Sequence, residues 1–197
     1  KTEEIVRKWC NDQAVKFQLI LEHDVNEVLC CIAGAKAANG DIFIFVQDDM
    51  CFYECGWDRL LCEKVMTYGL VGGRLGCEFT LERGIAGSEK LRWRLKCGRD
   101  TLIGRIALAI HRYMKLDIRF LCSGQRTYVN RGPFVINAKI YNSLGGFDPI
   151  FAPIDLDCMD LSCKYTSRYD RPYVYPVGYN ELAGTKVNSE ESQAKSR

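Results

Sequence analysis

The 197-residue sequence has no apolar run long enough to cross a bilayer, and no signal-peptide pattern precedes its first expected helix. Its formal net charge of +2 is too small to indicate a surface for nucleic acid. The sequence also has no internal repeat and no glycine-rich phosphate loop beside a basic residue. We therefore expect neither a membrane-spanning protein nor a nucleic-acid-binding protein.

Cysteine is abundant, but the spacings that build zinc or disulfide sites are missing. The eleven cysteines include no Cys-x-x-Cys pair, so the paired knuckles of a structural zinc site are absent from the sequence. The odd count and the chain length also argue against a small secreted disulfide scaffold. We interpret the cysteines as free thiols, which predicts a cytoplasmic protein.

What is present is the composition of one globular domain followed by a polar tail. Hydrophobic residues make up 47% and charged residues 26% of the sequence, and the length allows a sizeable core. From residue 180 the chain becomes polar, and we predict a disordered tail at residues 180–197.

An apolar run at residues 42–46 ends abruptly in Gln47-Asp48-Asp49. Without polar alternation it predicts a central strand that is buried on both faces, as in a parallel sheet. Open α/β sheets bind ligands at the carboxyl ends of such strands. If the chain stays extended, Gln47 and Asp49 share one face, and Asp49 is the expected metal ligand. The alternative is that Asp48 and Asp49 only cap a following helix.

The preceding residues predict a strand, a helix and a strand in succession, which indicates an α/β fold. Residues 15–21 alternate and then become apolar, which predicts a strand ending at Glu22-His23-Asp24. Residues 29–38 predict a helix, and a further short strand is expected at 70–73. Such units join parallel strands by right-handed crossovers. We expect a mostly parallel central sheet flanked by helices, with Asp24 at a second strand end.

The segment at 90–96 alternates apolar and basic residues. In an extended segment, one side would carry Lys90, Arg92, Arg94 and Lys96. One interpretation is an edge strand protected by charge. The other is a contact with an anionic partner, such as a lipid phosphate at a membrane surface or the diphosphate of a donor. In the helix that follows, we interpret His111 as structural.

A second acidic cluster, formed by Asp155, Asp157 and Asp160, lies at the start of the last predicted helix. Asp157 and Asp160 are three residues apart and share a helix face. Asp160 can instead form an ion pair with Lys164 one turn later. Asp157 has no such partner and suits either a helix cap or a general base.

Three motifs in this order resemble the family 2 glycosyltransferases of the GT-A fold. They are Gly40-Asp41 leading through the apolar strand into Gln47-Asp48-Asp49, then Gly145-Gly146-Phe147-Asp148, and then Asp157-x-x-Asp160-Leu161. The likeness covers residues 2–177. It implies one domain at 1–179, with a nucleotide-binding part at about 1–75 and an acceptor-side part at about 76–179.

The resemblance implies an enzyme that transfers a sugar from a nucleotide-sugar to a hydroxyl of a carbohydrate, glycolipid or glycoprotein acceptor, with inversion. Asp49 matches the metal-binding end of the family's Asp-x-Asp motif, and Mn²⁺ or Mg²⁺ is the implied cofactor. Asp24, Asp48 and Gln47 are the implied donor contacts. These cations prefer oxygen ligands and neutralise charge on the leaving group. The acidic helix start supplies the general base, with Asp157 preferred and Asp155 and Asp160 as alternatives.

Some positions depart from the family pattern. Gln47 stands where the first Asp of the motif usually lies, Cys158 falls where a second acid is common, and no strand precedes the first helix. These departures favour an alternative hypothesis, a degenerate glycosyltransferase-like module that binds without turnover. A third hypothesis is a metal-dependent nucleotidyltransferase, which also uses strand-end carboxylates.

Overall fold

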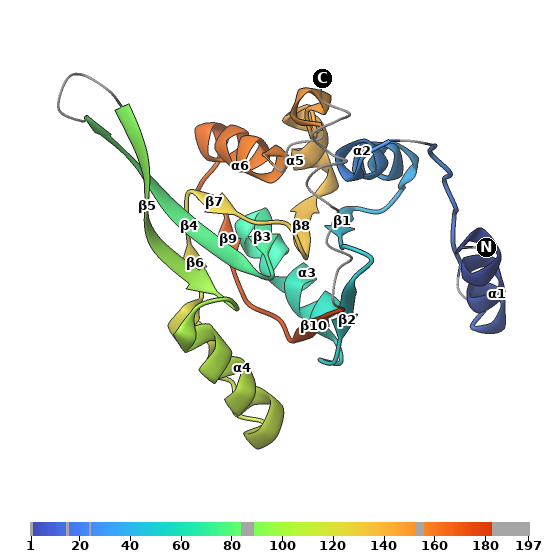
Figure 1. Ribbon diagram of the computed structural model, residues 1–197, viewed down its shortest axis with the longest axis horizontal. Helices are drawn as coiled ribbons and strands as arrows, with labels where there is room; N and C mark the ends of the chain where they lie inside the picture. Colours follow the sequence, from blue (N-terminus) through green and yellow to red (C-terminus); the bar gives the residue numbers. More distant parts are fainter. Residues whose placement is uncertain (1, 15, 24, 84–88, 153–155, 183–197) are drawn as a thin grey trace, which may run out of the picture.

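A computed structural model describes residues 2–14, 16–23, 25–83, 89–152 and 156–182, with the backbone alone for residues 2, 79–83 and 89–95. It has a mixed α/β architecture in one small domain (Figure 1). The described helices are α1 (Thr2–Asp12), α2 (Glu27–Ala37), α3 (Trp57–Tyr68), α4 (Leu102–Met114), α5 (Ala138–Ser143) and α6 (Asp157–Arg168), with short 3-10 turns η1 (Arg119–Cys122) and η2 (Pro149–Phe151). None of these helices has the length and apolar content that crossing a bilayer requires.

The central sheet joins five described strands in the order β1-β8-β3-β9-β6. They are β1 (Ile42–Phe45), β8 (Phe134–Asn137), β3 (Leu70–Gly72), β9 (Tyr173–Val174) and β6 (Gly124–Gln125). Only β3 and β9 pair in parallel, whereas β1 with β8, β3 with β8 and β6 with β9 pair antiparallel. The expected mostly parallel sheet is therefore wrong for the described strands. β8 lies between β1 and β3, so these two point the same way without touching.

The strand expected at residues 42–46 is present as β1, but it is not central. Among the described strands it pairs only with β8, so its other edge is open. Phe43 is its buried residue, Ile42, Ile44 and Phe45 are half-buried, and Val46 is 48% exposed. Residues 16–21, where a neighbouring strand was expected, form no strand, and Val15 lies outside the described residues. The missing neighbour explains why β1 is less buried than its sequence predicts.

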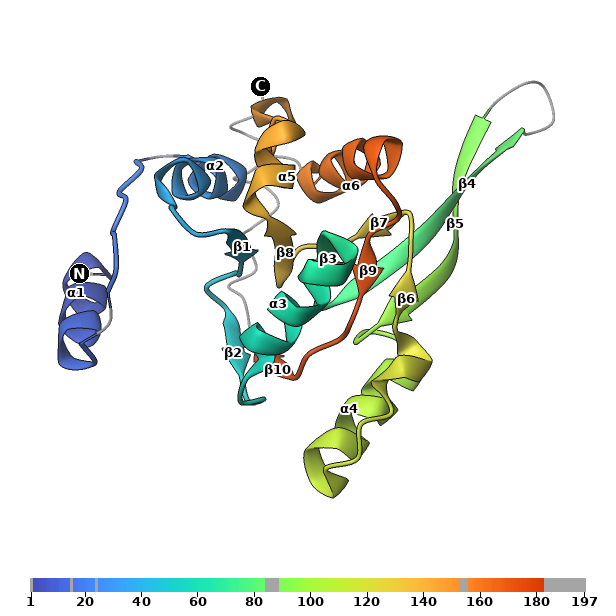
Figure 2. The same ribbon diagram turned by 180° about the vertical axis from the view of Figure 1, so that it is seen from behind.

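Alternation along the strands divides the core between two layers of helices. Phe134 and Ile136 of β8 pack into one cluster with side chains from α2, α5 and α6. Val135 points to the opposite face and packs with Leu61 and Val65 of α3. The sheet is thus covered by α2, α5 and α6 on one face and by α3 on the other (Figures 1 and 2). The helix expected at 29–38 is confirmed as α2.

Two further sheets extend the domain. In one, β4 (Leu75–Arg83) pairs antiparallel with β5 (Glu89–Gly98) and with β7 (Tyr128–Val129). In the other, β10 (Tyr179–Glu181) pairs antiparallel with β2 (Met50–Phe52). The domain boundary expected at residue 179 therefore falls inside a strand, and residues 183–197 of the expected tail lie outside the described chain. In both ribbon views α1 and α4 project from the body (Figures 1 and 2).

Candidate functional site

The turn after β1 carries the first acidic group predicted from the sequence. The backbone N–H of Met50 donates to the carbonyl of Gln47 at 3.3 Å, so the chain turns at Asp48-Asp49 and does not stay extended. The next element is β2, not a helix, so the interpretation of Asp48 and Asp49 as a helix cap is wrong. Their turn opens a hollow of about 470 Å³ that is lined by Glu27, Cys30, Cys31, Val46, Gln47, Asp48 and Asp49. We call it the strand-end hollow.

Asp49 has a buried carboxylate oxygen that is suited to a cation. Its Oδ1 is buried and accepts no hydrogen bond from the described residues. No group of three His, Cys, Asp or Glu side chains in the described part of the chain could hold a metal ion. Mg²⁺ and Mn²⁺ can be held by one or two carboxylates when substrate phosphates complete the coordination. Asp49 therefore fits a cation shared with a bound diphosphate and does not fit a cage made of protein alone.

Asp157 begins α6 in the interior of the protein. The residue is 1% exposed, and its Oδ2 forms an ion pair with a guanidinium nitrogen of Arg131. The N-cap residue of α6 is Leu156, and Asp157 is the first residue inside the helix, so the helix-cap interpretation is wrong. The other oxygen, Oδ1, is buried and accepts no hydrogen bond from the described residues. Asp157 thus keeps one carboxylate oxygen for a hydroxyl that enters its cavity.

The cavity beside Asp157 adjoins the strand-end hollow. Its volume is about 110 Å³, and its lining consists of Gln47, Arg74, Asn130, Arg131, Asp157 and Cys158. Gln47 lines both spaces. Arg131 connects them a second time, because its Nη1 also lies 2.6 Å from Oε2 of Glu27 on the wall of the strand-end hollow. No single described cavity is lined by both Asp49 and Asp157.

Arg131 is the functional candidate that sequence reasoning missed. Its side chain is 7% exposed. Burial opposes its charge, but the hydrogen bonds to Asp157 and Glu27 outweigh burial and raise the pKa of the guanidinium. The single charged residue in segment 128–137, which is otherwise uncharged and mostly apolar, was the available signal. Such residues are rarely buried without a partner.

The remaining predicted site residues lie elsewhere or outside the described chain. Asp160 lines neither space, and its Oδ2 lies 2.6 Å from Nζ of Lys164, which confirms the ion-pair interpretation. Asp24 and Asp155 lie outside the described residues. So do the side chains of Lys90, Arg92 and Arg94, whereas Lys96 is exposed. The backbone there forms β5, with β4 as its one described partner.

Three cysteines line the two spaces, Cys30 and Cys31 in the strand-end hollow and Cys158 in the Asp157 cavity. Burial raises the pKa of Cys31 to about 11, although Arg131 acts in the opposite direction. Burial and the neighbouring Asp157 raise the pKa of Cys158 as well. Because the thiolate is the reactive form, burial favours the unreactive thiol form of Cys31 and Cys158. All eleven cysteines are free in the structure, as the sequence analysis expected.

A larger, arginine-rich cavity lies on the other side of Arg74, and the sequence did not predict it. It has a volume of about 650 Å³ and includes Arg74, Arg99, Arg105 and Arg112 with the rings of Tyr53, Tyr113 and Tyr179. Arg74 also lines the Asp157 cavity. The Asp157 cavity therefore shares one lining residue with each of the other two spaces, Gln47 with the strand-end hollow and Arg74 with the arginine-rich cavity.

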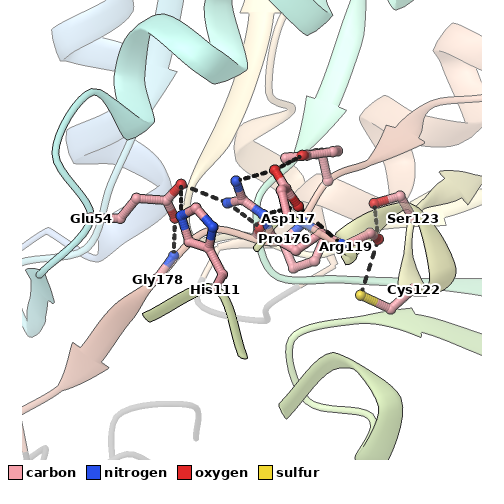
Figure 3. A network of polar contacts seen from close by, with 9 residues as sticks. Glu54, His111, Asp117, Arg119, Cys122, Ser123, Pro176 and Gly178 are labelled. Carbon is pink, nitrogen blue, oxygen red and sulfur yellow. Dashed lines mark hydrogen bonds and ion pairs between the residues drawn. The ribbon is translucent and has the colours of Figure 1, made fainter. Parts of the chain in front are cut away.

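A partly buried ion network lies beside the last turn of α4 (Figure 3), and none of its residues lines the three cavities. Nη1 of Arg119 lies 2.6 Å from Oε1 of Glu54, and its Nη2 lies 2.7 Å from Oδ2 of Asp117. Tyr175 donates its hydroxyl to Asp117, and Nε2 of His111 lies 3.5 Å from Glu54 (Figure 3). These contacts connect α4, η1 and the segment before β10. His111 therefore has the structural position that was expected.

Comparison with family models and with curated proteins gave no match to this chain. The functional assignment therefore depends on the geometry of the site.

Proposed function

We propose that this protein is a glycosyltransferase that moves a sugar from a nucleotide-sugar to an acceptor hydroxyl. The supporting observation is that Gln47 borders both the strand-end hollow, with Asp48 and Asp49, and the cavity of Asp157. Two acidic groups far apart in sequence therefore lie on adjoining spaces. Sugar transfer needs one carboxylate near the diphosphate and another near the attacking hydroxyl.

In this proposal the donor diphosphate occupies the strand-end hollow, with Asp49 as the protein ligand of Mn²⁺ or Mg²⁺ and Asp48 and Gln47 in contact with the donor. When bound, the cation would neutralise the charge that develops on the leaving diphosphate. Asp157 is the general base for an inverting transfer. Its free Oδ1 accepts the proton of the hydroxyl, while Arg131 holds Oδ2 and fixes the orientation of the carboxylate.

The acceptor enters from the arginine-rich cavity, which reaches the Asp157 cavity at Arg74. Tyrosine rings can stack against the apolar face of a sugar, whereas Arg74 and Arg99 are already paired with Asp100 and Glu181 of the same lining. The acceptor class that fits this lining is a carbohydrate or glycolipid.

Titration of nucleoside diphosphates with and without Mn²⁺ tests the donor half of the proposal. We expect Mn²⁺-dependent binding that is lost in Asp49→Asn and kept in the matched control Asp58→Asn, since Asp58 is exposed on α3 away from the hollow. Binding that is independent of the cation and unchanged in Asp49→Asn would refute it.

Donor hydrolysis or sugar transfer tests the chemical half. Asp157→Asn should lower the turnover rate by about 10²–10⁴-fold while nucleoside diphosphate binding stays unchanged. Asp160→Asn is the matched control, because it changes a carboxylate one turn along the same helix.

One observation favours a second candidate, a glycosyltransferase-like module that binds sugar without turnover. Asp157 is already in an ion pair with a buried arginine, which neutralises the charge that a general base uses. If this candidate is correct, ligand binding will occur without any transfer or hydrolysis. Turnover that disappears in Asp157→Asn would exclude it.

A further inference from the structure

Helix α4 turns its most apolar face away from the protein. The side chains on that face are between 50% and 77% exposed, and they are Leu102, Ile103, Ile106, Tyr113 and Met114. The face that packs against the body is narrow. Its buried residues are Gly104, Ala107 and Leu108. At 3.6 residues per turn Leu102, Ile106 and Tyr113 lie opposite these packed residues, whereas Ile103 and Met114 lie on the flank beside Ala107. α4 is thus amphipathic, but its apolar face is exposed, whereas a surface helix usually packs its apolar face against the core.

The apolar surface continues beyond the helix. Leu116, Phe120 and Leu121 are each more than half exposed, and they lie in the segment that folds back against α4 through η1. The helix and this segment project from the body in both ribbon views (Figures 1 and 2). Soluble monomers rarely expose so many large apolar side chains in one contiguous region. This surface therefore has an occupant.

The charges around the apolar face indicate which occupant. α4 contains no acidic residue, and Arg105 and Arg112 lie seven residues apart along one edge of it, between the apolar and the packed faces. Among the described residues neither arginine forms an ion pair, whereas Arg74 and Arg99 are already paired with Asp100 and Glu181. Lys115 follows at the helix end. Arg112 stacks on the ring of Tyr53, with its guanidinium carbon 4.5 Å from the ring centroid. Positive charges without an acidic partner among the described residues thus border the exposed apolar residues.

We propose that α4 and residues 115–121 lie in the interface of a lipid bilayer with anionic headgroups. A short helix with an apolar face and arginines along its edge fits an interfacial position, with side chains such as Ile106 below the headgroups and Arg105 and Arg112 beside the lipid phosphates. A second copy of the chain fits less well, because a two-fold contact through this face brings the arginines of both copies together. This inference does not depend on the proposed transferase reaction.

Co-sedimentation of the full chain with vesicles tests the inference. We expect binding to vesicles of phosphatidylcholine mixed with phosphatidylglycerol, little binding to phosphatidylcholine alone, and release as the salt concentration rises. Ile106→Asp should weaken binding by about tenfold or more, because it removes an inserted aliphatic side chain and adds a negative charge. Arg105→Gln with Arg112→Gln should weaken it by about thirtyfold.

Matched controls distinguish a specific contact through this surface from non-specific adsorption of the protein to vesicles. Met66→Asp changes an apolar side chain on α3 that is 73% exposed, and Lys8→Gln with Arg59→Gln removes two exposed charges elsewhere. Both controls should bind vesicles like the parent. Equal losses in the controls, or no binding of the parent to anionic vesicles, would overturn the proposal. So would light scattering that shows a dimer which Ile106→Asp converts to monomer, since the occupant would then be a second copy.

Discussion

The ion pair between Arg131 and Asp157 gives the sharpest prediction about stability. Asp157 is 1% exposed, and the Arg131 side chain is 7% exposed. In Arg131→Met the Asp157 carboxylate stays buried without its partner, which costs about 3–5 kcal/mol of unfolding free energy. In Asp157→Asn the guanidinium keeps Glu27, whose side chain is 44% exposed and already partly hydrated, so the loss should be smaller, about 2 kcal/mol.

The double variant Arg131→Met/Asp157→Asn distinguishes a specific pair from two independent contributions. It removes both charges, so its total loss should be about 3 kcal/mol, which is less than the sum of the two single losses. Urea unfolding followed by tryptophan fluorescence measures all four proteins. Additive losses, or a larger loss for Asp157→Asn than for Arg131→Met, would refute the reasoning, because the uncompensated buried carboxylate would then not be the main cost.

Three further predictions concern other ion pairs. Arg119→Met should lower the unfolding free energy by about 3–4 kcal/mol, because it leaves Glu54 without its main partner. The Glu54 side chain is 9% exposed. A loss near zero in urea unfolding would contradict this prediction. The hydrogen bond from Arg119 holds the pKa of Asp117 below its usual range. The unfolded chain therefore binds more protons there, so stability should fall as the pH drops below the usual carboxyl range, and Asp117→Asn should flatten that acid limb in thermal unfolding. Asp160→Asn should change the unfolding free energy by about 0.5 kcal/mol or less, since its contact with Lys164 is a partly exposed pair one turn apart; a larger change in the same urea assay would give Asp160 a further role.

Local sequence patterns predicted where individual helices and strands lie, but they did not predict which strands pair. The helix at 29–38 and the strand at 42–46 were found because apolar spacing reports the period of each element. The strand expected at 15–21 did not form in its described residues, and the central position expected for β1 was wrong. Alternation in one segment says which residues are suited to burial, but it does not say which strand will pair with it.

The sequence alone determined that Asp48 and Asp49 follow a strand and that Asp157 begins a helix. Strand ends and helix starts can be predicted in this way because they depend mainly on residues that are close in the sequence. Only the tertiary structure decided that Gln47 would join the two spaces, that Arg131 would face Asp157, and that the apolar face of α4 would point outward. These outcomes depend on how distant segments pack. The energy of a buried charge or an exposed apolar surface depends on its neighbours in space, which a periodicity within one segment does not specify.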